Sequence, residues 1–202
     1  MAGGMVRLEM SISLDGFAAG AGVSVEHPMG HDRGLIHDWM FNGKTDREAK
    51  AWEEEQFAGT GALIMGSTTF EVGVGPWGGN PTFHAPCFVV SHHSREMIVK
   101  EGGTSYTFVI DGIESALAQA KAAAATKDVV VMGGANIARQ FIRAGLLDEM
   151  RIHLVPVLLG AGTRLLDDLG PEPVDLEPFE VVNTPQVTHL RYRFSTRLRP
   201  AH

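Results

Sequence analysis

Three short clusters of glycine, hydroxyl and histidine residues follow apolar runs of the sequence. They are Gly66-Ser67-Thr68-Thr69, Ser91-His92-His93 and Gly133-Gly134-Ala135-Asn136. Glycine lets a ligand approach the backbone, hydroxyl groups donate to phosphate oxygens, and a following helix supplies free N–H groups. Each cluster alone could be no more than a tight turn. Because ligands of open α/β sheets bind beyond the carboxyl ends of the strands, the three together predict a cradle for a phosphorylated cofactor.

Two other places could face a substrate. In His37-Asp38-Trp39 a carboxylate stands beside an aromatic ring that could cover a planar molecule and shield the carboxylate from water. A surface aspartate beside a core tryptophan explains the same pattern. His153 alternates with Ile152 and Leu154, so its side chain points away from theirs, towards either a cleft or a solvated face.

The elements that would position these residues alternate between strands and helices. Over residues 6–14 apolar residues alternate with polar ones, Glu9 among them, which predicts a strand with one apolar and one polar face. Asp15-Gly16 ends this strand, and 20–43 follows as a long segment without clear periodicity, which is typical of a binding loop. Further strands are predicted at 62–65, 87–90, 106–110, 128–132, 150–159, 179–182 and 187–195, with helices at 45–59, from 70, at 112–125 and at 137–144.

This order of elements predicts the fold class. Apolar strands separated by helices indicate an α/β fold with a mainly parallel sheet covered on both faces. The last two strands predict an antiparallel hairpin at one edge of the sheet. We therefore expect a single domain over residues 1–202, because no internal repeat or linker divides the chain.

Composition limits what such a domain does. The formal net charge of −7, from 17 Lys+Arg and 24 Asp+Glu, argues against a nucleic-acid partner. No apolar stretch approaches the roughly 18 residues of a membrane span. The single Cys87 cannot form an internal disulfide, so we expect a cytoplasmic protein. The nine histidines form no H-E-x-x-H motif and have no cysteine cluster beside them, so no metal site is expected.

Five motifs occur in order along nearly the whole chain. They are SISLDGFA at 11–18, LIMGSTTFE at 63–71, VVMGGANI at 130–137, GLLDE at 145–149 and VPVLLGAG at 155–162. In this order the chain resembles the dihydrofolate reductase family, and most closely the C-terminal reductase domain of the bacterial riboflavin-biosynthesis deaminase/reductase. The resemblance implies a dihydrofolate-reductase-like sheet of about eight strands, NADPH bound across the strand ends, and hydride transfer to a small heterocycle. It also implies a homodimer.

The resemblance assigns roles to individual residues. Thr69 matches a threonine that contacts cofactor phosphate, Ala18 would lie near the nicotinamide, and His153 matches a position that faces the substrate. The first cluster, Gly66, Ser67, Thr68 and Thr69, would meet the phosphates; the third, Gly133, Gly134, Ala135, Asn136 and Ile137, would bind the pyrophosphate. Ser91 and His92 would lie near the adenosine ribose and its 2′-phosphate.

The sequence departs from dihydrofolate reductases at two places. Ser67 stands where those enzymes usually carry a basic residue, so recognition of the 2′-phosphate would rest on His92, His93 or Arg95. Their substrate-binding carboxylate on the first helix has no clear match, since the position falls near 50–51. We therefore expect dihydrofolate not to be the main substrate.

The missing carboxylate leaves the proton donor open. Asp38 is the first candidate for the substrate-side carboxylate, with Trp39 as the stacking aromatic, and Glu9 on the polar face of the first strand is the second. The proton would come from Asp38 or from water admitted through the early loop. The leading hypothesis is an NADPH-dependent reductase of a pyrimidine or pterin, such as the reductase step of riboflavin biosynthesis. A binding protein without catalysis and a flavin-dependent oxidoreductase are the alternatives.

Overall fold

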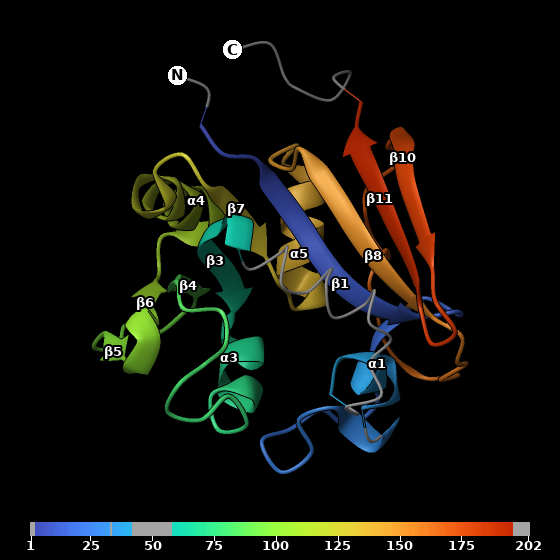
Figure 1. Ribbon diagram of the computed structural model, residues 1–202, viewed down its shortest axis with the longest axis horizontal. Coiled ribbons are helices and arrows are strands. Elements are labelled where there is room, and N and C mark those ends of the chain that lie inside the picture. The colour runs from blue at the N-terminus through green and yellow to red at the C-terminus, as the bar shows by residue number, and fades with distance from the viewer. Residues whose placement is uncertain (1–2, 33, 42–57, 196–202) are drawn as a thin grey trace.

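The computed structural model describes residues 3–32, 34–41 and 58–195, and its largest feature is a nine-stranded sheet (Figure 1). The strand order is β10-β11-β8-β1-β7-β3-β4-β6-β5. The six central strands are mutually parallel: β1 (Val6–Ser13), β3 (Thr60–Gly66), β4 (Pro86–Val90), β6 (Ser105–Val109), β7 (Asp128–Val131) and β8 (Glu149–Val155). The edges are antiparallel, formed by β5 (Ile98–Val99) on one side and by β10 (Leu176–Asn183) with β11 (Thr188–Phe194) on the other.

The predicted mainly parallel sheet with a C-terminal antiparallel hairpin is therefore confirmed, with nine strands where about eight were expected. A separate two-stranded ribbon pairs β2 (Phe17–Gly20) with β9 (Gly162–Arg164). The predicted strand at 150–159 ends at Val155, because Pro156 follows and cannot donate to the ladder. In the described part of the predicted loop 20–43 the structure has two short 3-10 helices (Gly30–Asp32 and Leu35–His37) and α1 (Asp38–Phe41).

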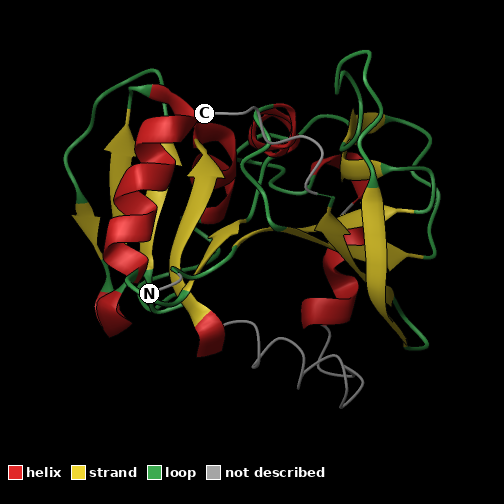
Figure 2. Cartoon of the chain, turned by 90° about the horizontal axis from the view of Figure 1, so that it is seen from above, coloured by secondary structure: helices red, strands yellow, loops and turns green. Residues whose placement is uncertain are grey.

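Helices cover both faces of the sheet, as predicted (Figure 2). On one face α4 (Gly112–Ala124) and α5 (Ala135–Arg143) pack on Leu8, Ile64 and Val131 in the largest apolar core. On the other face α3 (Ser67–Gly73) packs Phe70 against a second core, and α1 places Trp39 in a third. The helix predicted at 45–59 lies, except for its last two residues, outside the described part of the chain.

The carboxyl ends of the parallel strands meet at one edge of the sheet. In Figure 1, β1 and β3 both point downwards, towards α1 and α3 respectively. The polar face of β1 is buried along its length, because Arg7, Glu9, Ser11 and Ser13 are all less than 9% exposed. Among the described residues, no helix combines the length and the apolar character needed to span a bilayer.

Candidate functional site

A cavity of about 650 Å³ extends across the carboxyl ends of the central strands. This volume is typical of a site for a small molecule or cofactor. The end of the cavity near β4 and β6 is lined by Ser91, His92 and Gly112, which follow these strands. The opposite end is lined by Glu9 of β1 and His153 of β8. Between these ends lie the starts of α3 and α5.

The turns before α3 and α5 are in direct contact. Gly66 N donates to Gly133 O at 2.8 Å, which ties the first predicted cluster to the third. A Cβ at Gly66 would lie 2.9 Å from Ile137 Cγ1, and a Cβ at Gly134 would lie 3.3 Å from Thr69 Oγ1. Glycine is therefore required at Gly66 for the two turns to approach this closely.

The start of α5 has the chemistry that a pyrophosphate requires. Its N-cap residue is Gly134, and no side chain caps the helix, so its first N–H groups are available to a ligand. The hydroxyl groups of Ser67, Thr68 and Thr69 line the same part of the cavity. These donors fit the phosphates of a dinucleotide, which is the group that the sequence analysis placed here.

Most of the predicted site residues lie around this one cavity. The lining includes Ala18, Trp39, Gly66, Ser67, Thr68, Thr69, Ser91, His92, Gly134, Ala135, Asn136, Ile137 and His153. Gly133 is buried, has a φ of +107° and is not among the lining residues. Asp38 is exposed and is not among the lining residues, so the structure does not bring the predicted proton donor to the cavity.

The end of the cavity near β1 and β8 is built from an aromatic ring, a carboxylate and two imidazoles. Trp39 Nε1 donates to Ser11 Oγ at 3.2 Å, which fixes the indole. The centroid of the indole lies 4.7 Å from the centroid of the His153 ring. Glu9 Oε1 lies 3.0 Å from His153 Nε2. His153 Nδ1 lies 2.8 Å from Nδ1 of His189 on β11. Sequence analysis named Glu9 only as the second candidate and missed His189.

The missed residue has a physical signature that only the strand pairing reveals. His189 stands opposite His153 in the β8–β11 register and is 1% exposed. Burial, followed by the charge of His153, lowers the pKa of His189 to about 4. Its alternation with Leu190 was visible in the sequence, but its partner lies on a strand 36 residues away.

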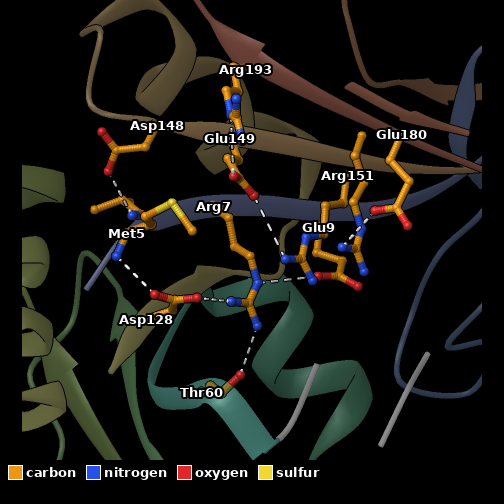
Figure 3. Close-up of polar contacts among 12 residues, drawn as sticks. Met5, Arg7, Glu9, Thr60, Asp128, Asp148, Glu149, Arg151, Glu180 and Arg193 are labelled. Atoms are coloured by element: carbon orange, nitrogen blue, oxygen red, sulfur yellow. Dashed lines mark hydrogen bonds and ion pairs between the residues drawn. The ribbon is translucent and has the colours of Figure 1, made fainter. Parts of the chain in front are cut away.

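A buried network of alternating charges supports Glu9 from beneath (Figure 3). Glu9 Oε2 lies 3.6 Å from Arg7 Nε, and Arg7 also forms an ion pair with Asp128 and donates to Thr60 Oγ1 at 3.1 Å. Burial is the largest influence on the guanidinium and lowers the pKa of Arg7. Because a buried charge is tolerated only when it is paired, these contacts hold the Glu9 carboxylate in one position.

Asp15 joins the end of β1 to the segment after β8. Its carboxylate accepts hydrogen bonds from Ser13 Oγ at 2.6 Å, from Gly160 N at 2.8 Å and from Leu159 N at 3.1 Å. The bond from Ser13 is the largest cause that lowers the pKa of Asp15 to about 2. The turn at Asp15-Gly16 therefore fixes where β2, which carries Ala18, enters the cavity wall.

Comparison with known proteins finds a matching family and a relative that matches a short segment of the chain. The RibD C-terminal domain family matches the chain over residues 5–190. Uncharacterized protein YyaP of Bacillus subtilis is 44% identical over 43 residues, which are 21% of this chain and 23% of that protein.

Two solved structures show the same fold. A Shewanella sp. PV-4 protein assigned by name to riboflavin biosynthesis is 21% identical with a TM-score of 0.72, covering 95% of this chain and 99% of that chain. The diaminohydroxyphosphoribosylaminopyrimidine deaminase/5-amino-6-(5-phosphoribosylamino)uracil reductase of Thermotoga maritima is 12% identical with a TM-score of 0.61, covering 95% of this chain and 57% of that chain. The chain therefore spans little more than half the length of that two-activity protein.

Proposed function

Because the chain belongs to the RibD C-terminal domain family, we propose that it is an NADPH-dependent reductase of a small planar heterocycle. The observation that carries the proposal is that one and the same cavity is lined by the start of α5, which no side chain caps, and by Glu9, Trp39 and His153. One part of this cavity suits phosphates, and the other suits a planar ring with polar edges. A reductase of this kind needs both parts within reach of each other.

The chain's own residues would hold the cofactor at three points. The N–H groups at the start of α5 and the hydroxyl of Thr69 would bind the pyrophosphate. Ser91 and His92 would lie beside the adenosine ribose, and Ala18 beside the nicotinamide. When bound, NADPH supplies the hydride; the protein supplies orientation and charge.

A pyrimidine is the first substrate to test. The Thermotoga protein is named as a reductase of 5-amino-6-(5-phosphoribosylamino)uracil, and this family membership makes that compound, or a related pyrimidine or pterin, the leading candidate. Trp39 offers a flat wall for such a ring, and Glu9 offers a carboxylate oxygen that accepts from ring or amino N–H groups.

A thermal-shift titration with NADPH, NADH and FMN tests the cofactor. Ligand bound to the native state raises stability by RT ln(1+[L]/Kd), so NADPH should raise the melting temperature more than NADH at equal concentration. Oxidation of NADPH with a panel of pyrimidines and pterins then tests the reaction. Binding without turnover would favour a protein that has lost the chemistry, and a shift with FMN alone would favour a flavin enzyme.

A further inference from the structure

Glu9, His153 and His189 form a continuous chain of hydrogen bonds from the cavity wall into the sheet. The three residues lie on the adjacent strands β1, β8 and β11. Glu9 and His153 line the cavity, whereas His189 is buried beside them and is not among the lining residues. We infer that the Glu9–His153 pair donates the proton that completes reduction of the substrate, and that His189 positions this pair. The inference rests on the proposed reductase function.

The position of Glu9 is suited to donation into the cavity. Its side chain is 7% exposed, one oxygen bonds to His153, and the other accepts no hydrogen bond from the described residues. That second oxygen has only the ion-pair contact with Arg7 Nε at 3.6 Å. A substrate nitrogen that accepts a proton from this oxygen would supply its missing hydrogen bond, since a buried carboxyl oxygen without a hydrogen bond is costly.

The charged groups around the pair come from all three strands. On β1, Arg7 lies beside Glu9. On the same face of the sheet as His153 and His189, and two residues away along each strand, Arg151 of β8 stands opposite Arg191 of β11. Trp39 lines the cavity beside the pair, and its ring centroid lies 4.7 Å from that of His153 and 5.1 Å from that of His189. These neighbours hold the imidazoles in place, and the cavity that Glu9 and His153 line gives the pair its access to substrate and solvent.

Reduction of a C=N bond takes one hydride and one proton. NADPH, when bound, would supply a hydride to the carbon of a substrate C=N bond, and the electron pair of that bond would move to the nitrogen. The nitrogen takes the one proton shared by Glu9 and His153, which leaves glutamate and a neutral imidazole. NADPH would become NADP⁺, and the pair would regain one proton from solvent through the cavity that Glu9 and His153 line, once the product has left.

His189 suits this positioning role because it does not compete with His153 for the positive charge. Burial, and then the charge of His153, keeps the pKa of His189 low, at about 4, so its ring is neutral near pH 7. A neutral ring can accept or donate at Nδ1 as His153 changes its protonation. The direct Nδ1–Nδ1 contact of 2.8 Å also leaves no space for a metal ion between the rings.

The test compares Glu9→Gln with a matched control, Glu177→Gln, on the exposed face of β10. In the protein alone, ¹⁵N NMR of the imidazoles should show changed shifts for His153 in Glu9→Gln and wild-type shifts in Glu177→Gln. With NADPH and a reducible heterocycle, Glu9→Gln should lower kcat about 10²- to 10⁴-fold, the range of general acid catalysis. Its affinity for NADPH, measured by thermal shift, should stay within about twofold of wild type.

A second pair of variants keeps the inference testable if Glu9→Gln fails to fold. His153→Asn should lower kcat in the same range as Glu9→Gln, and His189→Asn should lower it less, with KM unchanged and an altered pH profile. Turnover by Glu9→Gln and His153→Asn at the wild-type rate would overturn the assignment. So would loss of turnover in Asp38→Asn with Glu9→Gln unaffected. A wild-type protein that binds NADPH but reduces nothing would instead overturn the proposed reductase function itself.

Discussion

His153 and His189 face each other through their Nδ1 atoms, 2.8 Å apart, on neighbouring antiparallel strands. Only one hydrogen can occupy this contact, so the two rings cannot both carry a proton at Nδ1. The pair therefore resists the second positive charge. Burial adds to this effect, and together the two causes lower the pKa of His189 to about 4.

The free energy of unfolding should consequently fall as the pH falls from about 6.5 to about 4. The unfolded chain binds a proton at His189 near pH 6.5, whereas the folded chain does so only near pH 4, so acid favours unfolding in this window. Lowering the pKa of His189 by this amount corresponds to a loss of about 3 kcal/mol in the free energy of unfolding at the acid end of this pH range. Urea unfolding at pH 7.5, 6 and 5 measures it.

The control for this prediction is the exposed His27. His189→Gln should flatten the pH dependence between 6.5 and 4, and His27→Gln should leave it as in wild type. An equally steep dependence in His189→Gln would show that another group is responsible.

Gly66→Ala should weaken cofactor binding without unfolding the protein. The added methyl group would lie 2.9 Å from Ile137 Cγ1, so the turns before α3 and α5 must separate by a few tenths of an ångström. The two turns together form the proposed phosphate cradle, and a misplaced donor loses its hydrogen bond. At an NADPH concentration about 100 times the wild-type Kd, we expect the NADPH-induced thermal shift to fall by about half, which corresponds to about a tenfold rise in Kd.

Gly75→Ala serves as the matched control because a Cβ there meets nothing within 4 Å. It should keep the wild-type shift with NADPH. An undiminished shift in Gly66→Ala would mean that the cofactor does not use this contact.

Asp15→Ala should loosen the junction between the end of β1 and residues 159–160. The carboxylate accepts from Leu159 N and Gly160 N, and both amides lose their acceptor in the variant. Hydrogen exchange of these two amides should accelerate, while the exposed Asp167→Ala leaves them protected. In wild type the junction contributes stability above the ordinary pKa of aspartate, near 4, and loses it as the pH falls towards 2. Unchanged exchange in Asp15→Ala would contradict this role.

The strands of the central sheet were predictable because each is a continuous apolar run bounded by turn residues. The β2–β9 ribbon was not, since its four- and three-residue strands are separated by more than 140 residues. Asp38 and Trp39 were predicted to act together because they are neighbours in sequence. Adjacent residues of a helix point about 100° apart, so Trp39 turns inwards and Asp38 outwards.

The residues of the proposed phosphate cradle were visible in the sequence because its glycine and hydroxyl residues occur in contiguous clusters, and the structure places most of them around one cavity. The substrate end was not, because Glu9, His153 and His189 become neighbours only through the β1–β8 and β8–β11 registers. Nothing local to any of these three residues marks that pairing.

Cys87 should be unreactive towards thiol reagents in the native protein. It is fully buried on β4, its Sγ lies 3.4 Å from Ala85 O, and burial raises the pKa of the thiol. Because the thiolate is the reactive form, labelling by a disulfide reagent should require unfolding and should follow the unfolding rate. Ser94→Cys, at an exposed position of the same segment, should be labelled at once in the native state. Rapid labelling of Cys87 in wild type would mean that β4 opens locally, and the core beneath the cavity would then be far less rigid than its packing indicates.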